Sequence, residues 1–404
     1  MPGAYQAIVI GAGHNGLTCA CYLARAGLKV LVLERCETYG GMTVSEQLAA
    51  PGFLSDVHAS GYLVAKLTPA PDELGLARHG LELITPDPNS AQVFPDGRAF
   101  IIGRDVEETA RSMEQFSRAD ADAWRGLYRR YLAAKPEIVA GMTSTPRPLA
   151  NEFAGKDAVD RYRFQFQSAR SWVEETFQSP EMRYFFASCA LHGALAPDDA
   201  LGANFAWLFA SAVQDVGVSI VKGGMHNVSR ALAAELADHG GGIRVNAGVK
   251  SIAVEKGRAV SVRLDNGEVI GLDGVLASNV DPRHLALDLL GEAQIGESVA
   301  QKIKRYDWGQ SFFGSRRLAR LSVGLRSVFP DPRRGDRLLP LSLHQCEQSR
   351  VRQVAHQHGS AGSRVPRARP RFDRHRPPHG PQQRASCRRG NLTWTTAPAV
   401  NRLV

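Results

Sequence analysis

Three glycines near the start of the chain have the spacing that a nucleotide diphosphate site requires. Gly11, Gly13 and Gly16 read G-x-G-x-x-G and directly follow the apolar run of residues 7–10. In such a turn the first glycine lets the chain reverse tightly, the second lets the backbone approach a diphosphate, and the third lets the next helix pack closely. Glu34 stands 18 residues beyond Gly16, where a carboxylate can accept hydrogen bonds from an adenosine ribose. This acid favours an unphosphorylated ribose, as in FAD or NAD, over NADP.

The elements around these glycines must place them between a strand and a helix. Leu17, Ala20, Cys21 and Ala24 have helical spacing, and Gly27 stands where a C-terminal cap belongs. Residues 29–33 read K-V-L-V-L, and the continuous apolar run after Lys29 predicts a second parallel strand buried on both faces. A chance glycine turn in a chain with 39 glycines is the alternative interpretation. Strand, glycines, helix, strand and acid in this order favour the dinucleotide site, with His14 and Asn15 as further candidates at the helix start.

A second glycine pair follows the acid at the distance typical of a known flavoprotein family. Arg35, Gly40, Gly41, Met42 and Thr43 resemble the extended dinucleotide motif of the family that includes amine oxidases and phytoene desaturases. The resemblance implies FAD as the cofactor, with this segment passing along its diphosphate and ribityl chain. The family usually has Arg after the glycine pair, where this chain has Met42.

A later block of the chain also resembles this family. Residues 222–225 read K-G-G-M before an expected helix at 227–239, and strands are expected at 243–246, 249–254, 258–264, 268–271 and 273–277. In the family the backbone at the position of Val249 contacts the adenine, which makes Val249 a candidate by resemblance. The resemblance covers about residues 5–313 and is closest to the phytoene desaturase-like branch, including the group named pyridine nucleotide-disulfide oxidoreductase domain-containing protein 2.

The expected fold is α/β, with a discontinuous Rossmann-like FAD-binding domain and an inserted, largely helical α+β substrate domain. We assign residues 1–85 and 215–290 to the FAD-binding domain and residues 86–214 and 291–314 to an incomplete substrate domain. The inserted segment carries most of the aromatic residues, which either line an apolar pocket or fill the helical core.

The tail, residues 315–404, differs in composition from the rest of the chain. It contains 19 Arg, no Lys and 4 acidic residues, whereas the preceding residues carry 30 basic and 36 acidic side chains. The basic charge of the chain therefore belongs to the tail alone, and we expect no nucleic-acid partner. We expect the tail to be disordered and to arise from truncation or a frameshift after about residue 314; a genuine basic arm is the alternative.

Other features of the sequence limit the possible chemistry. The six cysteines contain no C-x-x-C pair, and no His or Cys cluster has metal-ligand spacing, so we expect no redox dithiol and no metal. No apolar run approaches the length of a membrane span, and the first strand begins too early to leave room for a signal peptide. We expect a cytoplasmic protein, which a lipidic substrate would bring into peripheral contact with a membrane surface.

The resemblance implies an FAD-dependent oxidoreductase, a dehydrogenase or desaturase or an isomerase, acting on a small apolar, carotenoid-like substrate. Oxygen or a quinone is the expected electron acceptor, and no catalytic residue can be assigned from the sequence. The alternative is a non-functional truncated relative, or a non-enzymatic binding protein on the fold of the Rab GDP-dissociation inhibitors. Complete family members have a final glycine-rich segment that faces the flavin, so we expect weak FAD retention in this chain.

Overall fold

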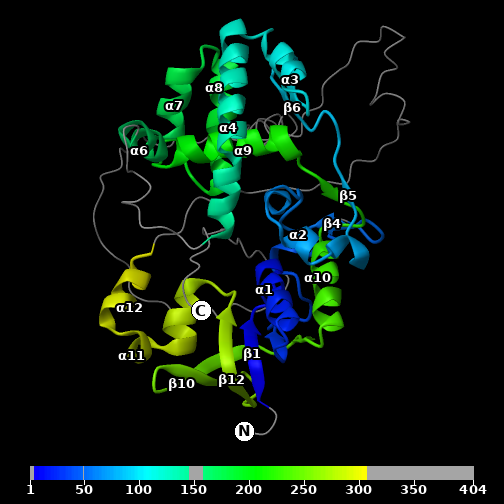
Figure 1. The fold of residues 1–404 in the computed structure, drawn as a ribbon, viewed down its shortest axis with the longest axis vertical. Helices are drawn as coiled ribbons and strands as arrows, with labels where there is room; N and C mark the ends of the chain where they lie inside the picture. The colour runs from blue at the N-terminus through cyan, green and yellow to red at the C-terminus, as the bar shows by residue number, and fades with distance from the viewer. Residues whose placement is uncertain (1–3, 49, 145–157, 307–404) are drawn as a thin grey trace, which may run out of the picture. The chain divides into compact units, whose positions relative to one another are not determined.

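The centre of the structure is a six-stranded sheet with the order β10-β11-β12-β1-β2-β9. The computed structural model describes residues 4–48, 50–144 and 158–306 (Figure 1). The mutually parallel strands are, in spatial order, β12 (Val269–Ser278), β1 (Tyr5–Ile10), β2 (Val30–Leu33) and β9 (Gly242–Arg244). The antiparallel strands are β10 (Val249–Glu255) and β11 (Arg258–Leu264). Residues 7–10 and 30–33 are all buried, as strands covered on both faces require.

Each face of β1 packs against a different apolar cluster. Ala7 and Val9 belong to the cluster formed with α1 (His14–Arg25) and α10 (His226–Asp238), which lie side by side in Figure 1. Ile8 and Ile10 point to the opposite face, where they join residues of β10, β11 and the π-helical segment η5 (His284–Leu290). The alternation of strand side chains therefore builds two cores around one strand.

β12 corrects one expectation from the sequence. The pattern predicts two strands, at 268–271 and 273–277, but the structure has a single strand that changes partner along its length. Its first residues pair antiparallel with β11, and Leu272 and residues 275–278 pair in parallel with β1. A Cβ on Gly274 would lie 2.2 Å from the carbonyl oxygen of Gln6, so only glycine permits this approach at the change of partner.

The chain between β2 and the helical region forms short elements. These are η1 (Gly41–Thr43), β3 (Ser45–Glu46), β4 (Ser55–Asp56), η2 (Val64–Leu67), α2 (Ala70–Glu73), η3 (Leu76–His79) and β5 (Leu83–Ile84). The sequence of residues 72–85 predicts a short helix followed by a strand that returns to the central sheet, and the placement of this strand is wrong. β5 pairs with β8 (Ile220–Val221) in a separate two-stranded sheet. Ile84 is exposed, which suits a small edge pair and not the interior of a parallel sheet.

The turn residues Asp96-Gly97 predict a hairpin over residues 92–101, and the structure confirms it. β6 (Ser90–Val93) and β7 (Ala99–Ile102) form a two-stranded sheet. The Gly97 N–H donates to the carbonyl oxygen of Phe94 at 3.0 Å, and Gly97 has φ +86°. Gln92–Ala99 belongs to a second compact unit, and the other described residues belong to the first.

The region between β7 and β8 is helical, as expected. Its helices are α3 (Val106–Met113), α4 (Arg118–Thr143), α6 (Ala158–Phe166), α7 (Ala169–Thr176), α8 (Pro180–Cys189), η4 (Ala190–Gly193) and α9 (Gly202–Val216). Side-chain caps define several starts: Asp105 caps α3, Ser117 caps α4, Ser168 caps α7 and Ser179 caps α8. The two helices after η5 are α11 (Glu292–Ile295) and α12 (Glu297–Lys304).

Buried aromatic rings form the core of this helical region. Trp124, Tyr131, Phe177 and Phe186 are less than 2% exposed, and Phe177 and Phe186 stack at 4.5 Å between ring centroids. These rings fill the helical core, which is the simpler of the two roles we weighed.

Across the described part of the chain, no helix combines the length and apolarity that a membrane span requires. The α/β fold class is confirmed, and the expected basic tail lies outside the described residues.

Candidate dinucleotide-binding site

The three glycines form a tight turn between β1 and α1. Gly11 has φ +93°, and its N–H donates to the carbonyl oxygen of Leu33 at 2.8 Å. A Cβ on Gly16 would lie 2.2 Å from the carbonyl oxygen of Gly11. The third glycine therefore lets α1 begin almost in contact with the end of β1, as expected from the spacing.

The first turn of α1 has the features of an anion site. Gly13 is the N-cap residue and supplies no side chain, so no side-chain hydrogen bond caps the helix. His14 and Asn15 are its first two residues; His14 is half-buried and Asn15 is exposed. Burial lowers the pKa of His14, which favours a neutral imidazole at neutral pH. The N–H groups and the positive end of the helix dipole at this point suit a diphosphate.

Glu34 links the end of β2 to the glycine turn. Its Oε2 accepts from the Ala12 N–H at 2.8 Å, and its Oε1 accepts from the Cys36 N–H at 3.0 Å. Each oxygen has a second lone pair for another donor, such as a ribose hydroxyl. The structure therefore places the acid and the turn together, although they are far apart in the sequence.

Arg35 and Val249 lie near one another on the same side of the site. The Ala247 N–H donates to the carbonyl oxygen of Glu34 at 2.8 Å, which holds the start of β10 against the end of β2. A Cβ on Gly248 would lie 3.5 Å from Cβ of Arg35, and Val249 is the next residue. Arg35 is exposed and Val249 is half-buried.

The second glycine pair packs directly on the glycine turn. Gly13 and Gly40 form a parallel bridge, and the Gly40 N–H donates to the carbonyl oxygen of Ala12 at 2.9 Å. Gly40 and Gly41 have φ +124° and +55°, and a Cβ on Gly41 would lie 3.1 Å from Cα of Gly13. Both the backbone angles and the lack of space require glycine here.

Met42 and Thr43 connect this pair to the surrounding structure. The carbonyl oxygen of Met42 accepts from the Ala59 N–H at 3.1 Å, and the Met42 side chain is half-buried. Thr43 is buried, and its hydroxyl donates to the carbonyl oxygen of Gly40 at 2.8 Å and also contacts Ser229 of α10. The Thr43 side chain thus ties the second glycine pair to α10.

Two polar atoms at this edge of the sheet have no partner among the described residues. Ser278 Oγ lies at the end of β12, where Ser278 is in register with Ile10, and it is buried without a hydrogen bond. His226 Nδ1 is also buried and unpaired, and lies 3.1 Å from the position of a Cβ on Gly40. Unsatisfied buried polar atoms are rare in native proteins, so their presence here fits a site that a polar cofactor completes.

Sequence reasoning missed Asn279 as a residue of this site. Its N–H donates to the carbonyl oxygen of Ile10 at 2.8 Å, and its Nδ2 lies 2.8 Å from the position of a Cβ on Gly13. Asn279 therefore covers one side of the glycine turn. The only signal in the sequence was its place immediately after a strand, because parallel strands end at the same edge of a sheet.

A cluster of acidic and imidazole groups lies on α10 and η3. His79, Glu235 and Asp238 each offer one atom that could bind a metal, and these three atoms lie within 4.8 Å of one another. Arg78 donates to the same Glu235 carboxylate, whose side chain is fully buried, and Arg25 lies 4.0 Å from it. The cluster is therefore an ion-pair network that joins α1, η3 and α10.

Comparisons with known proteins agree with this arrangement. The family model described as flavin-containing amine oxidoreductase matches residues 16–313. One component of the limonene dehydrogenase of Castellaniella defragrans is 29% identical over 68% of this chain and 51% of its own length. Pyridine nucleotide-disulfide oxidoreductase domain-containing protein 2 of Rattus norvegicus is 29% identical over 75% of this chain and 58% of its own length.

A phytoene desaturase (lycopene-forming) of Paracoccus is 26% identical over 77% of this chain and 62% of its own length. The chain thus spans little more than half the length of these relatives. Among solved structures, a protein of Pyrococcus furiosus has a TM-score of 0.52 at 19% identity, over 74% of this chain and 65% of its own, a likeness of fold alone. Because the family match covers residues 16–313, the chain belongs to the flavin-containing amine oxidoreductase family.

Proposed function

We propose that this chain binds FAD at the carboxyl ends of β1 and β2 and supplies the nucleotide half of an oxidoreductase site. The observation that supports this most directly is the convergence of three separate segments. A backbone hydrogen bond joins the Gly40–Gly41 pair to the Gly11–Gly16 turn, and the Glu34 carboxylate accepts from the Ala12 N–H of the same turn. The two glycine segments leave room only for glycine where they meet. Such a crevice at the ends of parallel strands is where dinucleotides bind in α/β sheets.

Each segment would hold a different part of the cofactor. The first turn of α1, with Gly13, His14 and Asn15, would bind the diphosphate through N–H groups. Glu34 would accept hydrogen bonds from the adenosine ribose, and Val249, with Arg35 close by, would lie at the adenine. Gly40 to Thr43 would continue along the diphosphate toward the flavin.

Bound flavin supplies hydride acceptance, so the protein need contribute only position and an environment with little water. The backbone groups at the turn orient the cofactor, and the neutral imidazole of His14 can donate a hydrogen bond beside them. We assign no catalytic acid or base among the described residues.

We further propose a small apolar substrate. The names of two relatives refer to hydrocarbons, limonene and phytoene, and hydrocarbon chemistry needs few acid–base groups. Dehydrogenation, desaturation or isomerisation fits this proposal, with oxygen or a quinone as acceptor and peripheral membrane contact as the route to a lipidic substrate. No nucleic-acid partner is part of the proposal.

Calorimetric titration of the full chain tests the proposal without relying on turnover. The described site recognises the adenosine diphosphate half, so ADP and FAD should both bind with one site per chain, and FMN, which lacks that half, should not. Equal binding of FMN and FAD, or no binding of ADP at millimolar concentration, would refute it. Colourless protein that FAD does not stabilise thermally would favour a non-enzymatic role on the same fold.

A further inference from the structure

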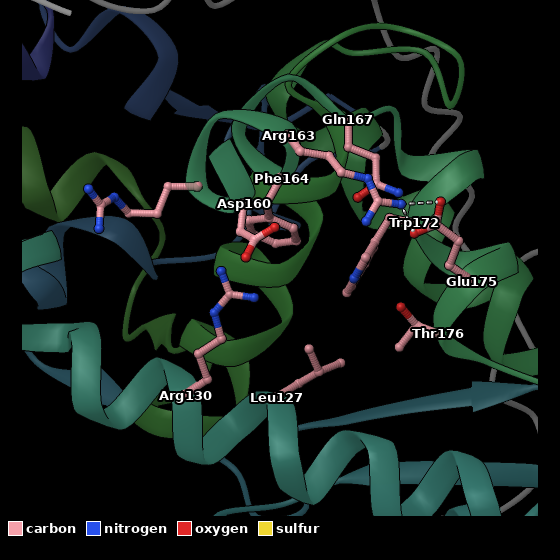
Figure 2. Close-up of a pocket in the computed structure, with 10 residues that line it drawn as sticks. Leu127, Arg130, Asp160, Arg163, Phe164, Gln167, Trp172, Glu175 and Thr176 are labelled. Atoms are coloured by element: carbon pink, nitrogen blue, oxygen red, sulfur yellow. Dashed lines mark hydrogen bonds and ion pairs between the residues drawn. The ribbon is translucent and has the colours of Figure 1, made fainter. Parts of the chain in front are cut away.

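A cavity of about 470 Å³ lies within the helical region, and none of its lining residues belongs to the dinucleotide site. It is bounded by α4, α6 and α7 (Figure 2). Its volume is within the usual range for small-ligand sites. Apolar walls come from Leu127, Phe164 and Trp172. The charged side chains of the lining are Arg130, Asp160, Arg161, Arg163 and Glu175.

The charged groups of the cavity differ in how they are paired. Arg163 donates to both oxygens of Glu175, at 2.8 and 2.7 Å, so this pair is neutral as a unit (Figure 2). Arg130 has no carboxylate within ion-pair distance among the described residues. Its guanidinium instead lies over two aromatic rings, 4.4 Å from the centroid of Phe164 and 4.9 Å from that of Trp207.

This arrangement leaves Arg130 ready to bind an anion. Contact with Phe164 and Trp207 restricts the guanidinium, and Trp207 is itself fixed by a hydrogen bond from its Nε1 to the carbonyl oxygen of Leu127 at 3.0 Å. The N–H groups at the edge of a stacked guanidinium remain available to donate. The neighbouring rings withdraw part of the guanidinium from water, and this desolvation lowers the pKa of Arg130, although the residue as a whole remains exposed.

We propose that this cavity binds a small planar monocarboxylate with an apolar body, held by a bidentate pair with Arg130. A carboxylate matches the guanidinium fork in geometry and charge. The apolar body would lie against Phe164, Trp172 and Leu127. Asp160 lines the same cavity and points toward Arg130 in Figure 2, so a second negative charge on the ligand would be repelled.

Titration of the full chain with benzoate tests this site, with heat and one-dimensional NMR line broadening of the ligand as readouts. Benzamide has the same shape without the charge, so it should bind about tenfold or more weakly. Benzylammonium and inorganic phosphate should bind more weakly than benzoate. Equal binding of benzamide would overturn charge recognition, and tighter binding of benzylammonium would assign the site to Asp160 as a cation site.

Variants separate Arg130 from general electrostatic attraction. Arg130→Gln should abolish benzoate binding, and Arg130→Lys, which keeps the charge but loses the planar fork, should weaken it about tenfold. Arg129→Gln is the matched control, because Arg129 is the neighbouring arginine of α4, is exposed like Arg130, and does not line the cavity. Asp160→Asn should strengthen binding.

Thermal unfolding of each variant verifies that it is folded. The proposal fails if Arg129→Gln weakens benzoate binding as much as Arg130→Gln does, if Asp160→Asn weakens it, or if benzoate does not bind the unmodified chain at millimolar concentration. Because none of the ligands contains a nucleotide, these outcomes are independent of flavin binding.

Discussion

Gly16→Ala tests most sharply the argument that backbone contact shapes the dinucleotide site. A Cβ at this position would lie 2.2 Å from the carbonyl oxygen of Gly11, whereas real Cβ atoms essentially never approach closer than 3.0 Å. The start of α1 must therefore move away from β1 by at least about 0.8 Å, the difference between these distances. Binding sites tolerate errors of only about 0.5 Å in the placement of their groups.

The expected effects follow from this displacement. Overpacking of this kind costs about 1–3 kcal/mol, and the lower chain entropy of alanine in the unfolded state offsets about 0.4–1 kcal/mol of it. We expect a net loss of about 1–2 kcal/mol in the free energy of unfolding. The affinity for ADP should fall by roughly tenfold to a hundredfold, because the N–H groups of the first helical turn no longer converge.

Gly126→Ala is the matched control, because it makes the same substitution inside a helix with no atom in the way. It should raise the free energy of unfolding by about 0.5–1 kcal/mol and leave ADP binding unchanged. Differential scanning fluorimetry and calorimetric titration with ADP measure both quantities. If Gly16→Ala matches Gly126→Ala in stability and in affinity, the close packing at the turn has no functional consequence and our reasoning is wrong.

Three further substitutions test carboxylates that accept hydrogen bonds in the structure. In Glu34→Gln an amide N–H would face a backbone N–H, so the free energy of unfolding should fall by about 1–3 kcal/mol, and the affinity for ADP should fall as well. Unchanged ADP affinity in calorimetric titration would contradict the proposed contact between Glu34 and the ribose. Asp120 is fully buried, and its Oδ2 accepts from the N–H and the hydroxyl of Ser179 at 2.9 and 2.6 Å. Asp120→Asn should therefore lower the free energy of unfolding, measured by urea titration, by about 1–3 kcal/mol. An unchanged free energy of unfolding would contradict this prediction. Burial alone would raise the pKa of Glu235, but hydrogen bonds from Arg78 and His79 outweigh it and lower the pKa. Glu235→Gln should therefore lower the free energy of unfolding by about 3 kcal/mol at pH 7. This difference from the unmodified protein should shrink as the pH falls through the depressed pKa of Glu235, because the native carboxyl then also becomes protonated. A difference that stays constant with pH would contradict a stabilising role for the ionised Glu235.

The sequence predicted the local elements of the site because each has a short-range signal. The Gly11–Gly16 turn, its helix and the second strand follow from residue types within a single β-α-β unit. The hairpin around Asp96-Gly97 and the strand at 258–264 were also correct, since turn residues bound them closely.

Features that depend on distant parts of the chain were not predictable in this way. The expected strands at 268–271 and 273–277 are separated at Leu272, between Gly271 and Asp273. The structure has one strand there, because Gly274 lets the chain pass close to Gln6 of β1. Asn279 and His226 reach the glycine turns only through the parallel alignment of strands and the packing of α10. The domain boundaries that we assigned stay a prediction.

Arg130 gives the clearest case of a feature that tertiary structure creates. In the sequence it is one of several charged residues on a long helix, with nothing to distinguish it from Arg129. The rings that it contacts come from α6 and α9, 34 and 77 residues further along the chain. Only the packing of these helices makes its environment different from that of its neighbour.

Hydrogen–deuterium exchange of the full chain, with and without saturating ADP, tests the central claim most directly. We predict slower exchange in peptides covering residues 11–17, 34–36 and 40–43 together, with no change in those covering 118–143. Protection confined to other regions, or protection of one of these three segments without the other two, would contradict a single dinucleotide site built from all of them.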